Sequence, residues 1–288
     1  MSIAAQRPSH ADQSGEPSWP PKVDIFGCDY SATTYDEAVD AIVDAVNRDE
    51  SGVVSCHAAH AVVEATGSKS LCEMVNQFDM VTPDGQPVRW AMNILHRTRL
   101  EDRVYGPELM LRLCERAADE RIPIYLYGGS PDVVKQLNDK LIRRLDLRIV
   151  GYESPPFREL TDTEDQEMVE RVNSSGAGIF FIGLGCPKQD IFAFEHRHKI
   201  NAVQICVGAA FDFHAGAKSM APRWMQRRGL EWLFRLIQEP RRLCRRYLTT
   251  STVFVAKLLW AMCNVPRVLH QRRQRLPSLQ RPSFREEL

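Results

Sequence analysis

Short apolar runs rich in β-branched and aromatic residues alternate with longer amphipathic stretches between Val23 and about Ala217. This alternation is typical of an α/β fold in which helices join parallel strands. We therefore predict a doubly wound, mostly parallel sheet. The strands are expected at 52–56, 79–82, 123–127, 147–151, 178–183 and 203–208, and the helices at 34–48, 58–76, 106–120, 131–145, 163–174 and 187–198.

The C-terminal part of the chain carries an excess of positive charge. Residues 218–288 hold 16 Lys and Arg against 4 Asp and Glu, although the whole chain has a formal net charge of zero. Leu230, Leu233 and Ile237 share one face of a predicted helix, and Pro240 ends that helix. An apolar face among arginines favours a pair of interfacial helices at an anionic membrane over a DNA-reading segment.

Composition divides the chain into four segments. Residues 1–21 are rich in Ser, Pro and Gln and contain no apolar run, which predicts a disordered leader rather than a signal peptide. An α/β core is expected at 22–217 and a helical, Arg-rich, membrane-associating appendage at 218–265. The basic tail at 266–288 is expected to be disordered.

Neither a membrane span nor a disulfide framework is evident. The most apolar segment, Val253 to Val265, is short and interrupted by Lys257, so it is expected to lie on a bilayer and not to cross one. The eight cysteines are scattered without a CxxC pair, which predicts reduced and mostly buried thiols and no zinc site. We therefore expect a cytoplasmic protein.

Most of the unusual polar residues follow the predicted strands, at the edge where open α/β sheets bind ligands. The segment TPDGQP follows the strand at 79–82 and places Asp84 in a Pro-Asp-Gly turn. Such a tripeptide is usually no more than a turn. A carboxylate at this edge is also placed to accept a proton from a substrate hydroxyl, so Asp84 is the candidate general base.

Two glycines, Gly128 and Gly129, follow the strand at 123–127, and Ser130-Pro131 opens the next predicted helix. Glycines allow close approach of a phosphate to the backbone and to the free amides at a helix N-terminus. Ser at the N-cap and Pro at the first helical position also make an ordinary strand-to-helix turn. Both interpretations stay open at this point.

Three further segments carry candidate binding residues that also have plain structural explanations. GLGCPKQD holds Lys188 and Gln189, a cation and an amide suited to phosphate or sugar hydroxyls, although such residues also cap helices. FDFHAG holds Asp212 and His214, for which hydrogen bonds within a turn are the favoured interpretation. Arg103 follows two acids and is a candidate for substrate binding or for an ion pair.

Two common motifs are missing from the sequence. GLGCPK has Lys in place of the third Gly of GxGxxG, so a dehydrogenase is disfavoured even though the predicted sheet is Rossmann-like. There is no Asp-x-Asp, the motif that usually holds the divalent cation in one large class of nucleotide-sugar transferases. We therefore expect neither a metal ion nor another cofactor. Protein cations and backbone amides would carry the charge of a leaving diphosphate.

Taken together and in order, six segments between about Val23 and Tyr247 resemble the WecG/TagA/CpsF glycosyltransferase family, glycosyltransferase family 26. They are TPDGQPVRW, DRVYGPELM, YLYGGSPDVV, GLGCPKQD, VGAAFDFHAG and the long segment from MAPRW to CRRY. The resemblance implies an inverting transferase that moves a sugar, often N-acetylmannosamine or its uronic acid, from a UDP donor. The implied acceptor is a sugar linked through diphosphate to a polyprenol at the cytoplasmic face of the membrane.

The resemblance also assigns roles to individual residues. Asp84 matches the base proposed for the family, and Arg103 and Gln189 match positions implicated in substrate binding. In the family, a C-terminal appendage is thought to close over the active site, with its arginines meeting diphosphate or anionic head groups. The arginines of this appendage are matched by Arg235, Arg242 and Arg245.

The chain departs from the family pattern near the presumed sugar site. Ser55-Cys56-His57 occupies the place of the usual Thr-x-Asn, and Asp190 replaces the Glu of Pro-Lys-Gln-Glu. Ser55 keeps a hydroxyl for substrate contact, whereas His57 differs from Asn in size and charge. These departures leave the identity of the donor sugar open.

Two alternatives accompany the leading hypothesis of a membrane-peripheral enzyme in cell-surface polysaccharide or teichoic-acid-type biosynthesis. One keeps the fold and transfers glucose in exopolysaccharide assembly. The other is a non-catalytic module that binds anions or nucleic acid through the arginines, which the apolar helix face and the carboxylate at the sheet edge disfavour. The leading hypothesis names the UDP-sugar, the polyprenol acceptor and an anionic membrane as partners, excludes nucleic acid and leaves homo-oligomers open.

Overall fold

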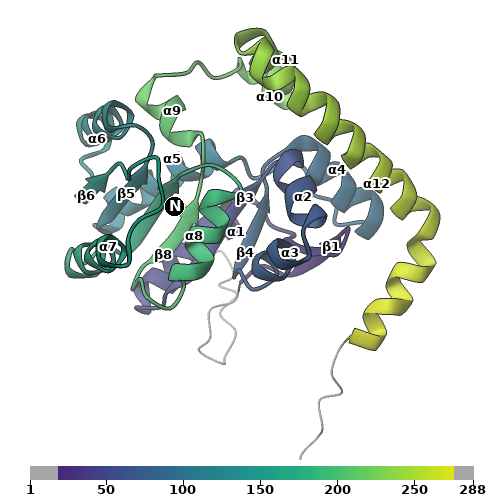
Figure 1. The fold of residues 1–288 in the computed structure, drawn as a ribbon, viewed down its shortest axis with the longest axis horizontal. Coiled ribbons are helices and arrows are strands. Elements are labelled where there is room, and N and C mark those ends of the chain that lie inside the picture. Colours follow the sequence, from purple (N-terminus) through teal and green to yellow (C-terminus); the bar gives the residue numbers. More distant parts are fainter. Residues whose placement is uncertain (1–18, 276–288) are drawn as a thin grey trace, which may run out of the picture.

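The computed structural model describes residues 19–275, and the side chains within them except at 223, 227, 242, 244–246 and 265–275. The described residues form an α/β fold with helices on both faces of a parallel sheet (Figure 1). All neighbouring strands of this sheet run parallel. The order is β4 (Met80–Pro83), β3 (Gly52–His57), β8 (Val203–Cys206), β7 (Ile179–Gly183), β5 (Ile124–Gly128) and β6 (Ile149–Glu153). The predicted fold class is confirmed.

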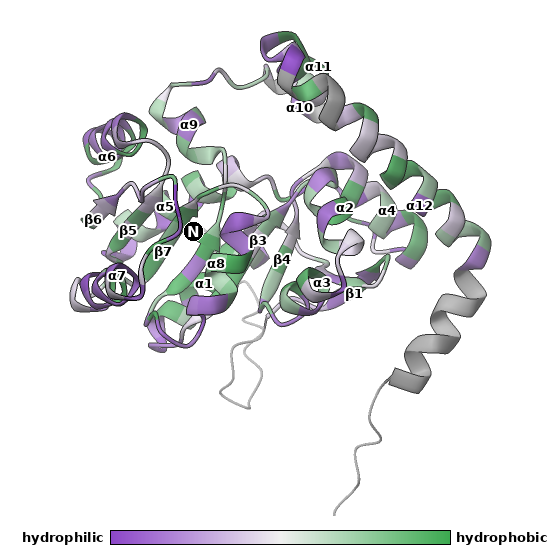
Figure 2. Ribbon diagram, in the orientation of Figure 1, coloured by the Kyte–Doolittle hydropathy of each residue, from purple (hydrophilic) through white to green (hydrophobic). Residues whose placement is uncertain are grey.

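Helices bury the sheet on both faces, and β7 and β5 are accordingly built mostly from apolar and aromatic residues, whereas β3 and β8 also contain the buried polar residues Ser55, His57 and Gln204. Figure 2 shows β7 in green, between helices whose ribbons carry both green and purple. One core cluster is built with α1 (Tyr35–Asn47), α5 (Gly106–Glu120), α6 (Pro131–Leu145) and α9 (Ala210–Ala215). The other is built with α2 (Ala59–Gly67), α3 (Lys69–Val75), α4 (Gln86–His96), α7 (Asp162–Ser174) and α8 (Lys188–His196).

Local capping signals set the ends of several helices. Thr34 and Thr161 each accept a hydrogen bond from the backbone of a Glu three residues later, and that Glu bonds back to the cap, which forms a capping box. Ser130 caps α6, which begins at Pro131 as the sequence indicates. The predicted helices at 106–120 and 131–145 therefore agree with α5 and α6 at both ends.

Other elements differ from the sequence prediction. The expected helix at 58–76 is divided into α2 and α3 because Ser68 is extended, with φ −128° and ψ 119°, and caps α3 by accepting from the Leu71 amide. The helix α4 and the antiparallel hairpin of β1 (Lys22–Ile25) and β2 (Cys28–Ser31) were not predicted. This hairpin lies beside β4, where the Ser31 hydroxyl accepts a hydrogen bond from the Val81 amide at 3.1 Å.

The C-terminal segment forms three helices, α10 (Arg223–Arg227), α11 (Glu231–Gln238) and α12 (Pro240–Arg275). The predicted break at Glu239-Pro240 separates α11 from α12. Figure 1 shows α12 running along α2 and α4. The helix continues to Arg275, whereas the sequence indicated a disordered tail from residue 266. Residues 276–288 of that tail, and residues 1–18 of the predicted leader, lie outside the described part of the chain.

Two contacts near its middle fix α12 on the core. Phe254 is 2% exposed, and its ring meets the edge of Phe26 at a centroid distance of 5.4 Å. The ammonium of Lys257 donates to the carbonyl oxygen of Thr66 at 3.0 Å and to its hydroxyl at 2.7 Å. Lys257 thereby satisfies a carbonyl at the C-terminal end of α2. None of the helices described from residue 19 to residue 275 is long and apolar enough to cross a membrane.

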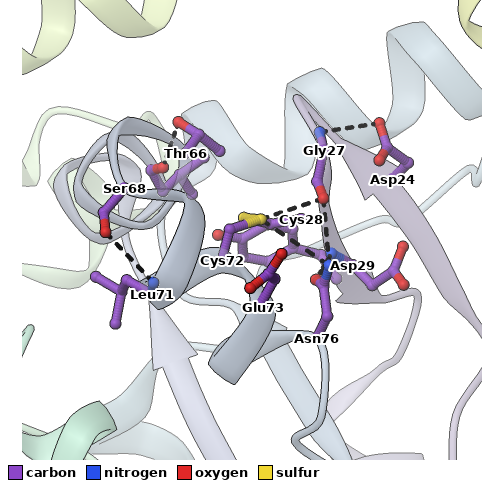
Figure 3. Close-up of a disulfide and its surroundings, with 12 residues drawn as sticks. Asp24, Gly27, Cys28, Asp29, Thr66, Ser68, Leu71, Cys72, Glu73 and Asn76 are labelled. Atoms are coloured by element: carbon purple, nitrogen blue, oxygen red, sulfur yellow. Dashed lines mark hydrogen bonds between the residues drawn. A yellow bond between two sulfur atoms is a disulfide. The ribbon is translucent and has the colours of Figure 1, made fainter.

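A disulfide between Cys28 and Cys72 joins β2 to α3 (Figure 3). The expectation that all eight cysteines are reduced is wrong for this pair. The two residues are 44 positions apart, and their spacing gives no indication that the hairpin folds back onto α3. Among the cysteines whose side chains are described, the others form no disulfide: Cys56, Cys114, Cys186, Cys206 and Cys263.

Candidate active site

Asp84 lies at the carboxyl end of β4, next to the start of α5. Its backbone amide donates to the carbonyl oxygens of His57 and Thr82, which fixes the turn against the neighbouring strand β3. Its carboxylate accepts a hydrogen bond from the amide of Gly106 at 3.1 Å. Gly106 is the first residue of α5, so the carboxylate meets the positive end of a helix dipole.

The loop that enters α5 carries Arg103 and Tyr105. Both side chains are buried, and the guanidinium of Arg103 lies over the Tyr105 ring at 4.2 Å from its centroid. The amide of Tyr105 donates to the hydroxyl of Tyr35 at 2.9 Å. The loop is held to β4 because the Val104 amide donates to the Pro83 carbonyl. Arg103 is therefore fixed close to the turn that carries Asp84.

The C-terminal helix α11 completes this cluster. Glu231, its first residue, accepts a hydrogen bond from Arg103 at 2.5 Å through one carboxylate oxygen. Its other oxygen pairs with Arg235, one turn later, at 2.9 Å. The Arg235 guanidinium also donates to the Tyr105 hydroxyl at 3.1 Å and lies over the Phe213 ring at 4.9 Å. The Nε of Arg235 is buried and has no hydrogen-bond partner among the described residues.

These neighbours set the acidity of Asp84. Burial raises its pKa to about 6, although the charges of Arg103 and Arg235 and the Gly106 amide act in the opposite direction. The charge of Glu231 contributes to the increase. For Glu231 itself, the two arginines outweigh the effect of burial and lower the pKa. At neutral pH Asp84 is thus an ionised carboxylate with the proton affinity of an effective general base.

A pocket of about 440 Å³ opens beside this cluster, between the core and the C-terminal helices. The core contributes residues 58–60, the Gly85–Pro87 segment that follows Asp84, and Arg103. The C-terminal helices contribute Glu231 and Arg235 together with an apolar wall. That wall includes Trp232, Leu236, Tyr247 and Leu248. The pocket therefore has charged groups next to Asp84 and an apolar side formed by α11 and α12.

Ser55 and His57 lie on β3 but point toward α8 and not into this pocket's charged cluster. The Ser55 hydroxyl donates to Asp190 at 2.6 Å, and the His57 ring lies 3.4 Å from the same oxygen. The other ring nitrogen of His57 lies 3.2 Å from the Tyr30 hydroxyl. All of these side chains are buried. Burial alone would raise the pKa of Asp190, but His57 and the bond from Ser55 hold it below its ordinary value.

The glycine turn after β5 is packed against backbone. A Cβ on Gly128 would lie 2.6 Å from the carbonyl carbon of Gly183, and the Gly129 amide donates to the Gly183 oxygen at 3.2 Å. Both glycines have positive φ, 127° and 69°. The close approach at Gly128 is thus to the neighbouring strand β7, and Ser130 caps α6. The turn interpretation accounts for these contacts, and phosphate binding there stays a prediction.

Lys188 and Gln189 lie at the start of α8 with different surroundings. Lys188 is exposed, whereas Gln189 is 2% exposed and accepts a hydrogen bond from the Gly185 amide at 3.1 Å. Asp212 forms an ion pair with Lys218 at 2.9 Å. His214 lies 2.7 Å from the Pro107 carbonyl oxygen, and burial lowers its pKa, so it is a neutral donor that joins α9 to α5. The expected turn at Asp212 and His214 is therefore wrong, because both residues belong to the helix α9 and contact residues outside it.

The predicted site residues therefore fall into separate groups. Asp84, Arg103 and Arg235 come together in one electrostatic cluster. Ser55 and His57 are bound to Asp190, and Gly128, Gly129 and Gln189 support loops. The side chains of Arg242 and Arg245 lie outside the described residues. No group of three or more His, Cys, Asp or Glu side chains with metal-binding geometry occurs in the described part of the chain.

A comparison with protein families identifies the chain. The model of the glycosyl transferase WecG/TagA/CpsF family matches residues 23–267, which include both the α/β core and most of the C-terminal helices. The chain belongs to this family. In this glycosyl transferase, the cluster around Asp84 is built from residues 84–106 and 231–235, two segments that lie far apart within the matched region.

The sequence did not indicate two members of the cluster around Asp84, namely Glu231 and Tyr105. A signal for Glu231 was present, because it is one of only four acids among residues 218–288, where 16 basic residues occur. An isolated acid in such a segment has a choice of cationic partners. Tyr105 carried no comparable signal, since its role depends on its hydroxyl accepting a hydrogen bond from Arg235, which lies 130 positions away on α11.

Asp84→Asn is expected to increase the free energy of unfolding, and more so at about pH 7.5 than at about pH 5. The folded-state pKa of about 6 lies above the ordinary value near 4, so folding penalises the ionised form. As the pH rises from about 4 to above 6, ionisation of Asp84 lowers the free energy of unfolding of the wild type by at most about 3 kcal/mol. Urea unfolding of both proteins at the two pH values measures the difference. A stabilisation independent of pH would contradict the raised pKa.

Proposed function

We propose that this family member is an inverting glycosyltransferase that moves a hexosamine-type sugar, N-acetylmannosamine or its uronic acid, from a UDP donor. The acceptor would be a sugar carried on polyprenol diphosphate, in cell-surface polysaccharide or teichoic-acid-type biosynthesis. The observation that carries this proposal is the Asp84 carboxylate, which has a pKa of about 6 and lies beside a pocket closed by the C-terminal helices. Membership of a glycosyl transferase family supports the reaction class.

The proposed reaction is a single displacement at the anomeric carbon of the donor. The acceptor hydroxyl gives its proton to Asp84 as its oxygen forms a bond to the anomeric carbon, and the bond from that carbon to the UDP oxygen breaks. Attack opposite the leaving group inverts the configuration of the anomeric carbon. UDP leaves as the diphosphate anion, and water takes the proton from Asp84 after product release.

Arginine supplies the charge that the departing diphosphate requires in this proposal. The Nε–H of Arg235 is buried without a partner among the described side chains, so it can donate to an incoming phosphate oxygen. Arg103 lines the same pocket. The chain contains no Asp-x-Asp, and we therefore propose that these cations and backbone amides act without a divalent metal ion.

The apolar surface of α11 and α12 supports attachment to the inner face of the cell membrane. Ile237 on α11 and Leu248 on α12 are 70% and 68% exposed. Leu259 and Trp260 farther along α12 are 57% and 65% exposed. Large apolar side chains on a helix with nearby arginines are typical of interfacial helices. The same helices wall the pocket, which would bring a lipid-linked acceptor next to Asp84.

Asp84→Asn is expected to lower kcat for sugar transfer by about a hundredfold or more, because Asn cannot accept the acceptor proton. UDP release is measured with a panel of UDP-hexosamines, UDP-hexuronic acids and UDP-glucose, each with a lipid-diphosphate-sugar acceptor, with and without excess EDTA. The proposal expects one hexosamine-type donor to react in both conditions. Product configuration is read by proton NMR.

Glu167→Gln is the matched control, because Glu167 is an exposed carboxylate on α7, far along the sequence from the cluster and paired only loosely with Arg171 at 3.9 Å. It should behave as wild type, and the Asn variant should still bind UDP. Transfer by Asp84→Asn at the wild-type rate would refute the assignment of the base. Turnover of UDP-glucose alone would replace the donor by the glucose alternative.

Replacing Leu259 and Trp260 together by Gln is expected to reduce association with anionic phospholipid vesicles by about fivefold or more, since two exposed apolar side chains are lost. Co-sedimentation measures the bound fraction. Phe157→Gln is the control, because Phe157 is 95% exposed but lies on the core between β6 and α7. Equal binding by all three proteins would contradict the membrane role of α12.

A further inference from the structure

Glu231 occupies an unusual position for an acid in the basic part of the chain. It is the first residue of α11 and is 7% exposed, although it carries a full charge. Each of its carboxylate oxygens is paired with a different guanidinium, that of Arg103 at 2.5 Å and that of Arg235 at 2.9 Å. One partner belongs to the core loop before α5 and the other to α11 itself.

The two guanidinium groups are held by more than charge. Arg103 lies over the face of Tyr105 at 4.2 Å, and Arg235 lies over Phe213 at 4.9 Å while it donates to the Tyr105 hydroxyl. The stacked rings fix the planes of the guanidinium groups, and Glu231 fixes their direction within those planes. A side chain shorter than Glu at this position would not reach both partners.

Glu231 also balances the charge that surrounds Asp84. The charged groups facing Asp84 are Arg103 from the loop before α5 and both Glu231 and Arg235 from α11. The titratable groups Tyr35, Tyr105 and Cys56 also face it, and all three are neutral at physiological pH because burial raises their pKa values. Two carboxylates and two guanidinium groups sum to zero. Without Glu231, the cluster would carry a net positive charge.

We propose that Glu231 is a positioning residue for the transfer reaction, which fixes the guanidinium groups of Arg103 and Arg235 beside Asp84 and balances their charge. The inference rests on the proposed function, because it takes Asp84 as the base. In this role the C-terminal helices do more than cover the pocket. They bring one cation for the diphosphate together with the anion that keeps Asp84 basic.

Removing the negative charge of Glu231 is expected to change how the transfer activity depends on pH. Two unbalanced guanidinium groups favour the ionised form of Asp84 and therefore lower its pKa. A base with a lower pKa is ionised at lower pH but accepts a proton less readily. Loss of the Glu231 charge should thus move the acid limb of the activity profile to lower pH and reduce the maximal rate.

The test is Glu231→Gln in the full-length protein, assayed for transfer from pH 4.5 to 9 with the reactive UDP-sugar and a lipid-diphosphate-sugar acceptor. The midpoint of the acid limb of kcat/KM is expected to fall by about one pH unit. We expect kcat to fall about tenfold or more, because the guanidinium groups are no longer held in place. Glu239→Gln is the control, since Glu239 follows the same helix and pairs with Lys218 at 3.5 Å.

The outcomes separate the inference from the proposed function. A lower kcat with an unmoved acid limb would mean that Glu231 only supports folding, and an unchanged profile would overturn the inference outright. A shift of equal size in Glu239→Gln would also overturn it. These results leave the proposed function intact as long as Asp84→Asn is inactive, whereas an active Asn variant removes the proposed function first.

A second variant serves if Glu231→Gln does not fold, as judged by circular dichroism and UDP binding. Glu231→Asp keeps the charge but is one methylene shorter. The acid midpoint is then expected to stay at the wild-type value while kcat falls, because both guanidinium groups cannot be reached at once. A wild-type kcat in Glu231→Asp would contradict the positioning role.

Discussion

The buried ion pair between Arg103 and Glu231 joins the C-terminal helices to the α/β core at the edge of the sheet. Both side chains are only 9% exposed, so the cost of removing two charges from water has to be offset by good geometry and further contacts. Tyr105 and Arg235 supply these contacts. Loss of either partner would leave the other charge buried without a counter-charge. The position of α11 and the arrangement of the charged side chains around Asp84 therefore depend on each other.

The same pair controls the environment of Asp84. A carboxylate in so enclosed a place would have a high pKa from burial alone, and one that faced two arginines alone would have a low one. In the structure, burial and Glu231 raise the pKa of Asp84 while the two arginines lower it, and the result is a pKa of about 6. Such a pKa is suited to a base that works near neutral pH. The helices that carry the apolar surface thus also adjust the chemistry of the core. A transferase that meets its acceptor at a lipid surface would gain from that connection.

Local signals in the sequence were sufficient for most of the fold. Proline at the start of α6 and the continuous apolar runs of the central strands predicted these elements closely. The division between α2 and α3, the hairpin at Lys22–Ser31 and the disulfide to Cys72 depend on contacts between distant segments, which no local pattern reports. The same holds for the site. Asp84 and Arg103 were recognisable, but Glu231 lies 128 positions from Arg103. The family-divergent residues His57 and Asp190 proved to contact each other, 133 positions apart.

We propose that Asp84 is an ionisable base whose pKa is adjusted by the C-terminal helices. Titration of the Asp84 side-chain carboxyl by carbon-13 NMR in the full-length protein, with Asp84→Asn used to assign the resonance, tests it most directly. We expect a midpoint of about 6, well above the ordinary carboxyl range. A midpoint near 4 would mean that Asp84 is a solvated turn residue, and it would contradict the role of Asp84 as a base adjusted by the C-terminal helices.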